Sequence, residues 1–491
     1  MPRFGESLPH TTAPMPDSPR QTLETEQKAL EINLDDTIYG TFSEIGAGQE
    51  VARYFFQVGA AAGTIAKTMS AYDKVYSDKI YGPEPSGRYV CESRLYRMLD
   101  HEYDLMTTRL QNERPGTNFF VFADTVSAIN YARTIPGNGW LGLRFQLHPD
   151  GEPNDLIVHA RMHDADNRLQ QQAIGILGVN MVHACYKCGD DLQDLIRALL
   201  DNLHGRVSID MIRLSGPDFR EVDNRLLALY LVQYGLTEVA MFGPDRSPVH
   251  PSEFLYRKSC LVVRGSFRPV TLVNYDMIQS AYEQFRAADK AEPGKTFLLT
   301  EITLANLAGK NGTVDEDDFL DRAELLNAMG QTVIISNCDS YRELTHYLKE
   351  YKVPLIGFVI GVRELLDLIT QRYYDNMDGK LLSAFGELFA RTVQFYVYPA
   401  QQEGSAELMT AHNLPVPDGV RFLYQHLLEG HQIVDVTGFN PDVLHIYSKR
   451  VLEMIANSEE GWEQMVPAKV ANLIKEKCLF GSPMQSVEFE Y

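Results

Sequence analysis

Arg264 and Arg268 flank a short Gly-Ser loop that follows an apolar run at 260–264. A guanidinium group presents a planar fork of N–H donors, which fits a phosphate or a carboxylate through two parallel hydrogen bonds. The pair therefore predicts a binding site for a small anionic ligand. The alternative is that each arginine forms a structural ion pair with a carboxylate of the same chain.

Glu301 lies near the end of another apolar run, at 296–302. Burial disfavours the ionised carboxylate and raises its pKa, as a general base that works near neutral pH requires. Glu301 is therefore a candidate catalytic residue, and His163, which follows the run at 156–162, is a second acid/base candidate. The simpler alternative for Glu301 is a buried salt bridge with an arginine such as Arg264.

Two Gly-Pro-Asp triplets end at Asp218 and Asp245, 27 residues apart, and each follows a predicted strand. These carboxylates could ligate a metal or orient a substrate hydroxyl, and Asp218 is kept as a catalytic candidate. The interpretation that we favour is structural. Glycine and proline form the turn, and the aspartate caps the next helix by accepting its first backbone N–H groups.

Gly46 and Gly48 form a glycine-rich turn that opens a helix. Backbone N–H groups at a helix start can hold a phosphate, so both glycines are candidate cofactor-binding residues. Val51 replaces the third glycine of a dinucleotide fingerprint, and the preceding strand at 37–42 is weak. We expect the βαβ context of a dinucleotide site to be missing, which leaves a flexible turn as the alternative.

No metal site is expected, and the sequence does not identify a cofactor. Cys185 and Cys188 form a single CxxC, but a zinc site would need a second half-site, and none is present. The six cysteines fit a reducing cytoplasm. The start of the chain carries no apolar segment typical of a secretory signal, so we expect a soluble, cytoplasmic protein.

The elements that would position these residues suggest an α/β fold with four regions. Residues 1–33 are expected to be a flexible tail, 34–150 a mostly helical region with strands, and 401–491 an α+β extension. Between them, 151–400 alternates short apolar runs with helical segments, which indicates a parallel βα-repeat core. The core could be barrel-like or an open doubly wound sheet. The predicted strands are 156–162, 207–214, 238–242, 260–264, 296–302, 331–336, 354–360 and 393–398.

The charge balance excludes several classes of partner. The 491 residues include 45 Lys and Arg against 66 Asp and Glu, which gives a formal net charge of −21. Nucleic acids and anionic membranes bind clustered basic residues, so neither is expected. A small anionic ligand is still compatible, because a local positive field can outweigh net charge at short range. A homo-oligomer is a further expectation, since the chain has 25 Tyr and 23 Phe and interfaces are rich in aromatic residues.

Several long strings together resemble a bacterial family of proteins described as nicotinate-nucleotide adenylyltransferases. The strings lie at 43–73, 170–184, 215–242, 262–271 and 433–455. The resemblance implies nucleotidyl transfer to a nicotinate-type nucleotide. The HxGH element of such transferases is absent here, and Gly430-His431 is the nearest string. No catalytic residue can therefore be transferred from that family to this chain.

Two functions follow from these observations. The first is an enzyme that acts on a small phosphorylated or carboxylated metabolite, with Arg264 and Arg268 holding the anion. The second is a non-catalytic homo-oligomeric scaffold or binding protein built on an enzyme-like fold. The enzyme requires the arginines and Glu301 to converge in one pocket, whereas the scaffold predicts that these side chains are paired with one another or with neighbours.

Overall fold

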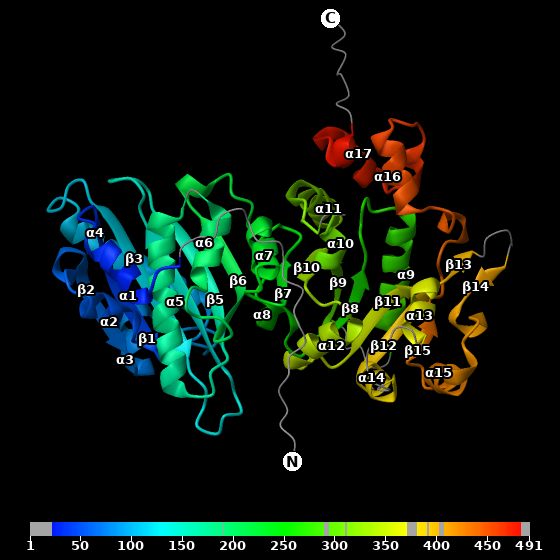
Figure 1. Cartoon of the computed structure of the whole chain (residues 1–491), viewed down its shortest axis with the longest axis horizontal. Helices are drawn as coiled ribbons and strands as arrows, with labels where there is room; N and C mark the ends of the chain where they lie inside the picture. Colours follow the sequence, from blue (N-terminus) through cyan, green and yellow to red (C-terminus); the bar gives the residue numbers. More distant parts are fainter. Residues whose placement is uncertain are drawn as a thin grey trace, which may run out of the picture. The chain divides into compact units, whose positions relative to one another are not determined.

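The computed structural model describes residues 22–189, 191–288, 294–309, 312–370, 381–389, 392–401 and 407–482 (Figure 1). The chain forms two compact units. The N-terminal unit comprises residues up to Thr237 together with Ala308–Val314, and the C-terminal unit comprises Glu238–Leu307 and the residues from Asp315 onward. Each unit has its own sheet and its own hydrophobic core. This division differs from the boundaries expected at residues 150 and 400.

The N-terminal unit is built on a six-stranded sheet with the order β2-β1-β3-β4-β5-β6. Strands β2, β1 and β3 are parallel, and β3 to β6 are joined by antiparallel pairs. The strands are β1 (Ile38–Gly46), β2 (Ile65–Ala71), β3 (Asn118–Ser127), β4 (Gly137–Phe145), β5 (Asn154–Met162) and β6 (Val207–Ser215).

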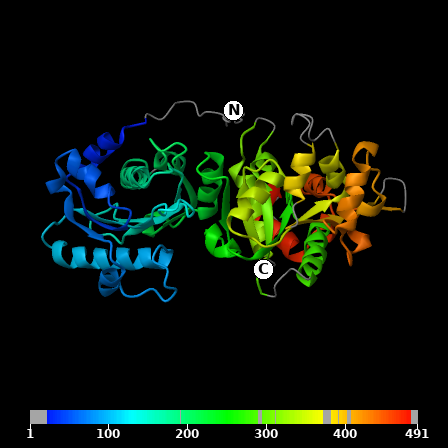
Figure 2. The ribbon, with the colours of Figure 1, turned by 90° about the horizontal axis from the view of Figure 1, so that it is seen from below.

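Helices cover both faces of this sheet. One face packs against α1 (Thr25–Asn33), α2 (Val51–Gln57), α5 (Asn167–Lys187), α6 (Leu192–Leu199) and α7 (Asn224–Gln233). The other face packs against α3 (Lys74–Tyr81) and the long helix α4 (Glu92–Leu110), which Figure 2 shows on the opposite side of the sheet from α2. The sheet therefore lies between two layers of helices.

Helix α1 occupies part of the segment that was expected to be a flexible tail. The buried Lys28 is the reason, because its Nζ lies 2.5 Å from Asp201 Oδ2 and 2.8 Å from Asn180 Oδ1. These partners lie more than 150 residues away in the sequence, so local composition does not reveal them. Residues 1–21 lie outside the described residues.

The βαβ context that was expected to be missing is present around the glycine-rich turn. Strand β1 is followed by the turn, by α2 and then by β2, which pairs in parallel with β1. The prediction of a weak strand at 37–42 was wrong because the polar residues of β1 are buried rather than exposed. Thr41, Ser43 and Glu44 each have less than 3% of their surface exposed.

The C-terminal unit has a seven-stranded sheet with the order β15-β12-β11-β8-β9-β10-β7. All pairs described are parallel except that of β7 with β10. The strands are β7 (Val239–Phe242), β8 (Ser259–Arg264), β9 (Thr296–Thr303), β10 (Thr332–Ser336), β11 (Ile356–Gly361), β12 (Val393–Tyr398) and β15 (Ile433–Asp435). Two short strands, β13 (Ala400–Gln401) and β14 (Leu408–Met409), pair separately.

Helices connect the parallel strands of this sheet. They are α8 (Pro251–Leu255), α9 (Leu272–Ala287), α10 (Leu304–Leu307), α11 (Glu316–Ala328), α12 (Tyr341–Glu350), α13 (Val362–Ile369), α14 (Leu381–Leu388) and α15 (Arg421–Glu429), with α16 (Ser448–Ala456) and α17 (Ala468–Lys477) after the last strand. No helix in the described parts of the chain is both long and apolar enough to cross a membrane.

The α/β class is confirmed, and the repeat core is an open sheet rather than a barrel. Six strands in the order β10-β9-β8-β11-β12-β15 follow the arrangement of a doubly wound fold, with β7 added antiparallel at one edge. The predicted strands 156–162 and 207–214 exist, as β5 and β6, but they pair antiparallel in the N-terminal sheet. The spacing of apolar runs along the sequence indicates where strands lie, but it does not indicate which strands pair with one another in a sheet.

Candidate functional site

The N-terminal sheet has a topological switch point at the carboxyl ends of β1 and β3. From β1 the chain passes through α2 to β2 on one side, and it then returns to form β3 on the other side of β1. In open α/β sheets, ligands bind outside the strand ends at such a point. The glycine-rich turn that contains Gly46 and Gly48 lies at this position.

Two buried carboxyl groups lie directly at this switch point. Glu44 of β1 and Asp124 of β3 are register partners on neighbouring parallel strands, so their side chains share one face of the sheet. Glu44 is 2% exposed and Asp124 is completely buried. We call these two residues the carboxyl dyad.

The first turn of α2 holds the Glu44 side of the dyad. The backbone N–H of Val51 donates to Glu44 Oε1 at 2.8 Å, and that of Ala52 donates to Oε2 at 3.4 Å. Asp124 Oδ1 accepts a single backbone N–H, from Ile45, at 3.2 Å. Hydrogen bonds to a carboxylate favour its ionised form. Glu44 is therefore the group better suited to carry the negative charge.

The glycine-rich turn packs its backbone against Asp124. Gly46 has φ +78°, in the left-handed region that glycine favours, and a Cβ at Gly48 would lie 2.1 Å from Asp124 Oδ1. Any side chain at position 48 would therefore collide with the carboxyl group. The glycines make room for the dyad in this structure.

Burial raises the pKa of both members of the dyad. For Glu44, desolvation is the largest cause and raises the pKa to about 7, while the N–H groups of α2 oppose this effect. For Asp124, desolvation and then the nearby Glu44 charge raise the pKa well above its ordinary value. A negative charge on one carboxyl group opposes ionisation of the other, so burial and this repulsion together favour the protonated form of Asp124.

This arrangement changes the expectation for Gly46 and Gly48. The helix-start N–H groups that would hold a phosphate already donate to Glu44. A phosphate at this turn would have to displace that carboxylate and would lie beside a second carboxyl group. The turn has the predicted form, but its electrostatics favour a ligand that is not an anion.

In the C-terminal unit, Arg264 and Glu301 form a buried ion pair. Arg264 Nε lies 2.8 Å from Glu301 Oε2, and Nη2 lies 3.0 Å from Oε1. Ser336 Oγ donates to Glu301 Oε1 at 2.6 Å, and the Arg264 guanidinium stacks over the ring of Tyr341. Glu301 therefore forms the buried salt bridge with Arg264 that was the alternative to a catalytic role.

Arg268 does not join Arg264 at a common anion site. Its Nε lies 2.5 Å from Asp318 Oδ1, and Asp318 also pairs with the buried Arg322. The two arginines that the sequence singled out therefore contact different carboxylates. The predicted convergence of Arg264, Arg268 and Glu301 in one pocket does not occur, because only Arg264 and Glu301 are in contact.

The remaining predicted residues make local contacts. His163 Nε2 is hydrogen-bonded to Ser208 Oγ at 3.0 Å in an exposed position. Asp218 Oδ2 accepts from Asn154 Nδ2 at 2.7 Å and so ties the turn after β6 to the start of β5. The structural interpretation predicted a helix cap at Asp218, whereas this hydrogen bond joins its carboxylate to a residue of strand β5. Asp245 accepts from Ser247 within its own turn.

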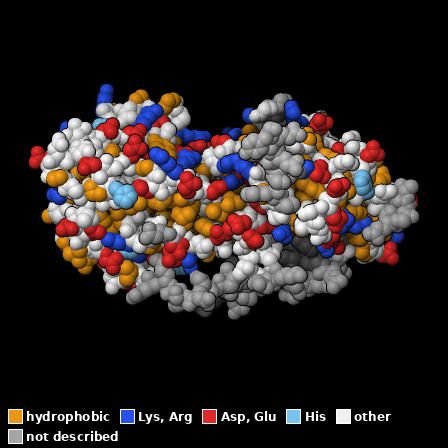
Figure 3. Space-filling view, turned by 90° about the horizontal axis from the view of Figure 1, so that it is seen from above, with side chains coloured by type: hydrophobic (Ala, Val, Ile, Leu, Met, Phe, Trp, Pro, Cys, Tyr) orange, Lys and Arg blue, Asp and Glu red, His pale blue; other side chains and the backbone are white. Residues whose placement is uncertain are grey.

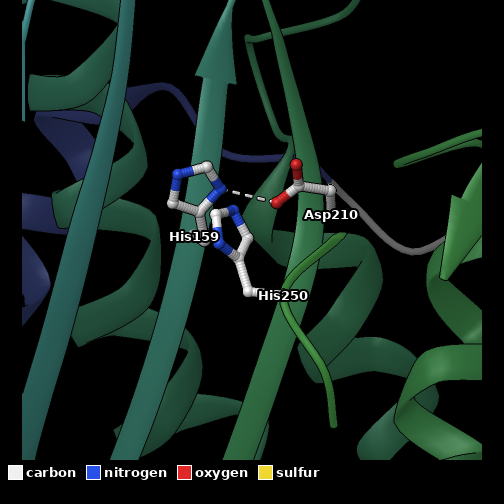
Figure 4. A group of neighbouring side chains, drawn as sticks. All are labelled: His159, Asp210 and His250. Atoms are coloured by element: carbon white, nitrogen blue, oxygen red, sulfur yellow. Dashed lines mark hydrogen bonds and ion pairs between the residues drawn. The ribbon is translucent and has the colours of Figure 1, made fainter. Parts of the chain in front are cut away.

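Sequence reasoning missed both members of the dyad and a second buried polar pair, His159 and Asp210. His159 Nδ1 is hydrogen-bonded to Asp210 Oδ1 at 2.6 Å (Figure 4), and the His159 ring packs edge-on against Trp140. The ladder between β5 and β6 shifts register at this point, a bulge that redirects the Asp210 side chain. The available signal was an ionisable residue inside an otherwise apolar strand in each case.

Charged side chains of both signs are visible on one face of the structure (Figure 3). On the face drawn in Figure 3, basic side chains lie among acidic ones and do not form a continuous basic surface.

Comparisons with known proteins do not assign a family. No family model matches the sequence, and no curated protein matches it. Among solved structures, a competence/damage-inducible protein CihA from Agrobacterium tumefaciens matches with 14% identity and a TM-score of 0.24, over 33% of this chain and 94% of its own. A CinA superfamily protein from Enterobacter cloacae matches with 13% identity and a TM-score of 0.24, over 36% of this chain and 96% of its own. Similarity at this level supports neither the adenylyltransferase resemblance nor another function.

Proposed function

We propose that the chain is an enzyme that transfers protons to and from a small molecule, with the Glu44–Asp124 dyad as its acid/base group. The observation that carries this proposal is the placement of two buried carboxyl groups side by side at a topological switch point. Paired carboxyls with raised pKa values are a recurrent solution for acid–base catalysis at neutral pH.

The two members of the dyad have different environments and therefore different roles. Glu44 accepts two N–H groups from α2, which stabilise its ionised form, so Glu44 is the base. Asp124 accepts one N–H and is completely buried, so it retains the proton and is the acid. In many enzymes, two carboxyl groups in contrasting environments act as the base and the acid of one reaction.

This proposal does not include nucleotidyl transfer. Such a reaction needs cationic groups to neutralise the phosphates, and the dyad is anionic. The arginines that could have met this need, Arg264 and Arg268, are paired with Glu301 and Asp318 in the C-terminal unit. A substrate without a phosphate at the reacting end fits the N-terminal site better.

A non-catalytic scaffold or binding protein is the second candidate. The specific observation in its favour is that Arg264 and Arg268 are each paired with a carboxylate, as the scaffold hypothesis predicted. Under this proposal the chain acts in the cytoplasm as a homo-oligomer, and the dyad is a structural feature of the N-terminal core.

A thermal-shift screen of small metabolites separates the two candidates. The wild-type chain and Glu44→Gln are screened in parallel at pH 7, and any metabolite that stabilises the wild type is then tested for chemical conversion. The enzyme proposal predicts a metabolite that the wild type binds and converts and that Glu44→Gln converts at least about 100-fold more slowly. Equal conversion by both chains, or no stabilising metabolite, contradicts the proposal and favours the scaffold.

A further inference from the structure

The C-terminal unit contains a cavity of about 560 Å³. Three helices line it: α9 through Tyr275 near its start, α11 through residues 327–330 at its end, and α17 through Pro467 and Lys469 at its start. Helices α11 and α17 are neighbours, as Figure 1 shows. Cavities that bind small molecules typically enclose about 300–1,000 Å³, so this one has room for such a ligand.

Part of the cavity wall is apolar. Ala328, Met329 and Pro467 line it, and none of their side chains carries a hydrogen-bonding N or O atom. The wall also includes the aromatic side chain of Tyr275, which is 43% exposed. Removing apolar surface from water is favourable, so a ligand with a hydrocarbon body would be stabilised by contact with this wall.

Two donors of the cavity wall lack a partner within the described parts of the chain. Neither Lys469 Nζ nor the Tyr275 hydroxyl forms an ion pair or a hydrogen bond there. The other two lysines of α17 are paired, because Lys475 Nζ lies 2.8 Å from Glu463 Oε1 and Lys477 Nζ lies 2.6 Å from Glu324 Oε1. Lys469 is therefore the lysine of this helix whose charge is available to a ligand.

The charge of the cavity wall favours an anion. None of the described residues that line it is acidic, and Lys469 supplies one full positive charge. The end of α11 and the start of α17 bring dipole ends of opposite sign, each about half an elementary charge, which offset each other. The remaining charge matches a single carboxylate, whereas a phosphate dianion would carry more negative charge than this wall balances.

We propose that this cavity binds a small carboxylate with an apolar body. Lys469 pairs with the carboxylate, the Tyr275 hydroxyl donates a hydrogen bond to it, and the apolar body lies against Met329 and Pro467. A mostly apolar wall with a few polar groups that orient the ligand is the usual design of a small-molecule site.

This site does not rest on the proposed acid–base function, because it lies in the C-terminal unit and the Glu44–Asp124 dyad lies in the N-terminal unit. It also differs from the anion site that the sequence predicted at Arg264 and Arg268, since both arginines are paired with carboxylates. Failure of this inference would leave the proposed function untouched.

Isothermal titration of the full chain at pH 7 tests the ligand class. Benzoate and hexanoate are the carboxylates, benzamide and hexanamide are their uncharged counterparts, and acetate and inorganic phosphate are anions without an apolar body. Binding of benzoate or hexanoate is expected. The matching amide should bind at least about tenfold more weakly, because it lacks the charge that pairs with Lys469. Acetate and phosphate should bind more weakly than either carboxylate, because they cannot cover the apolar wall.

Three variants test the residues that hold the ligand. Lys469→Met removes the charge but keeps an apolar side chain, and it should weaken carboxylate binding about tenfold or more. Tyr275→Phe removes only the hydroxyl and should weaken it about threefold to tenfold. Lys475→Met is the matched control, because it removes the same charge from α17 at a residue that does not line the cavity, and it should change the affinity by less than about twofold.

Four outcomes would overturn the inference. These are no binding of either carboxylate to the wild type, equal affinity for a carboxylate and its amide, unchanged affinity in Lys469→Met, and phosphate binding as tight as that of the carboxylates, which would identify a site for inorganic anions instead. If Lys469→Met does not fold, Tyr275→Phe and the comparison of each carboxylate with its amide decide.

Discussion

Glu44 and Asp124 occupy the same register position on two neighbouring parallel strands, and the first turn of α2 donates N–H groups to only one of them. Under the proposed function, this asymmetry distinguishes the base from the acid. The dyad lies in the N-terminal unit, whereas the arginines and Glu301 that sequence analysis emphasised lie in the C-terminal unit.

The raised pKa of Glu44 predicts that the folded state loses stability as pH rises. Burial raises the pKa of Glu44 from 4.5 to about 7, so the folded chain binds more protons than the unfolded chain between these values. Its free energy of unfolding should therefore fall with rising pH in this window, by up to about 1.4 kcal/mol per pH unit for one proton. Urea unfolding of the wild type and of Glu44→Gln at pH 5, 6 and 7 measures this.

The variant supplies the control for this prediction. Because Glu44→Gln cannot ionise at position 44, the fall in stability between pH 5 and 7 should be smaller than in the wild type. Identical slopes for the two chains would show that other groups cause the pH dependence.

Substitution of Gly48 by alanine should destabilise the chain. The new Cβ would lie 2.1 Å from Asp124 Oδ1, so either the turn or the carboxyl group must move, at a cost of roughly 1–3 kcal/mol. Gly63→Ala is the matched control, because a Cβ there meets nothing within 4 Å. Thermal unfolding measures the stability of both variants. If Gly48→Ala loses no more stability than Gly63→Ala, the close packing of Gly48 against Asp124 is contradicted.

The ion pair of Arg264 with Glu301 should be far more important for stability than that of Arg268 with Asp318. Arg264→Met leaves the fully buried Glu301 without its cation and is expected to cost about 3–5 kcal/mol. Arg268→Met should cost less than about 1 kcal/mol, because Arg268 is half exposed and Asp318 keeps Arg322. Denaturant unfolding of both variants checks the order, which would be refuted if the Arg268 variant were the less stable one.

The stability of helix α1 should depend on the buried ion pair of Lys28. Lys28→Met leaves Asp201 without a cation in the core, at an expected cost of about 3–5 kcal/mol. Lys187→Met, which removes an ion pair of a partly exposed lysine with Asp35 in the same unit, should cost much less. Hydrogen exchange of the 25–33 amides is the direct readout, and unchanged protection in Lys28→Met would show that the ion pair does not hold the helix.

The strands of the C-terminal unit could be predicted from the sequence because helices cover both faces of its sheet. The runs 260–264, 296–302 and 393–398 are mostly apolar and correspond closely to β8, β9 and β12. In the N-terminal unit, buried polar residues conceal the strands. In β3, Asp124 and Thr125 interrupt the apolar residues, yet the strand continues to Ser127.

The candidate site was less accessible to sequence reasoning than the fold. The pair of Arg264 and Glu301 could be anticipated, because both residues end apolar runs that a parallel sheet can bring together. The contact of Glu44 with Asp124 depends on β3 returning to the side of β1 opposite β2, and spacing does not specify that choice. Gly46 and Gly48 form the expected turn, and the group that this turn packs against is a carboxyl of the chain itself.

The pKa of Glu44 is the most direct test of the proposed acid–base function. Carboxyl carbons of the chain labelled with ¹³C-glutamate are followed by NMR between pH 4 and pH 9, in the wild type and in Glu44→Gln. One glutamate signal of the wild type is expected to titrate near pH 7 and to be absent from the variant. If every glutamate carboxyl titrates near its ordinary value of 4.5, the dyad holds no proton at neutral pH and the proposed function is wrong.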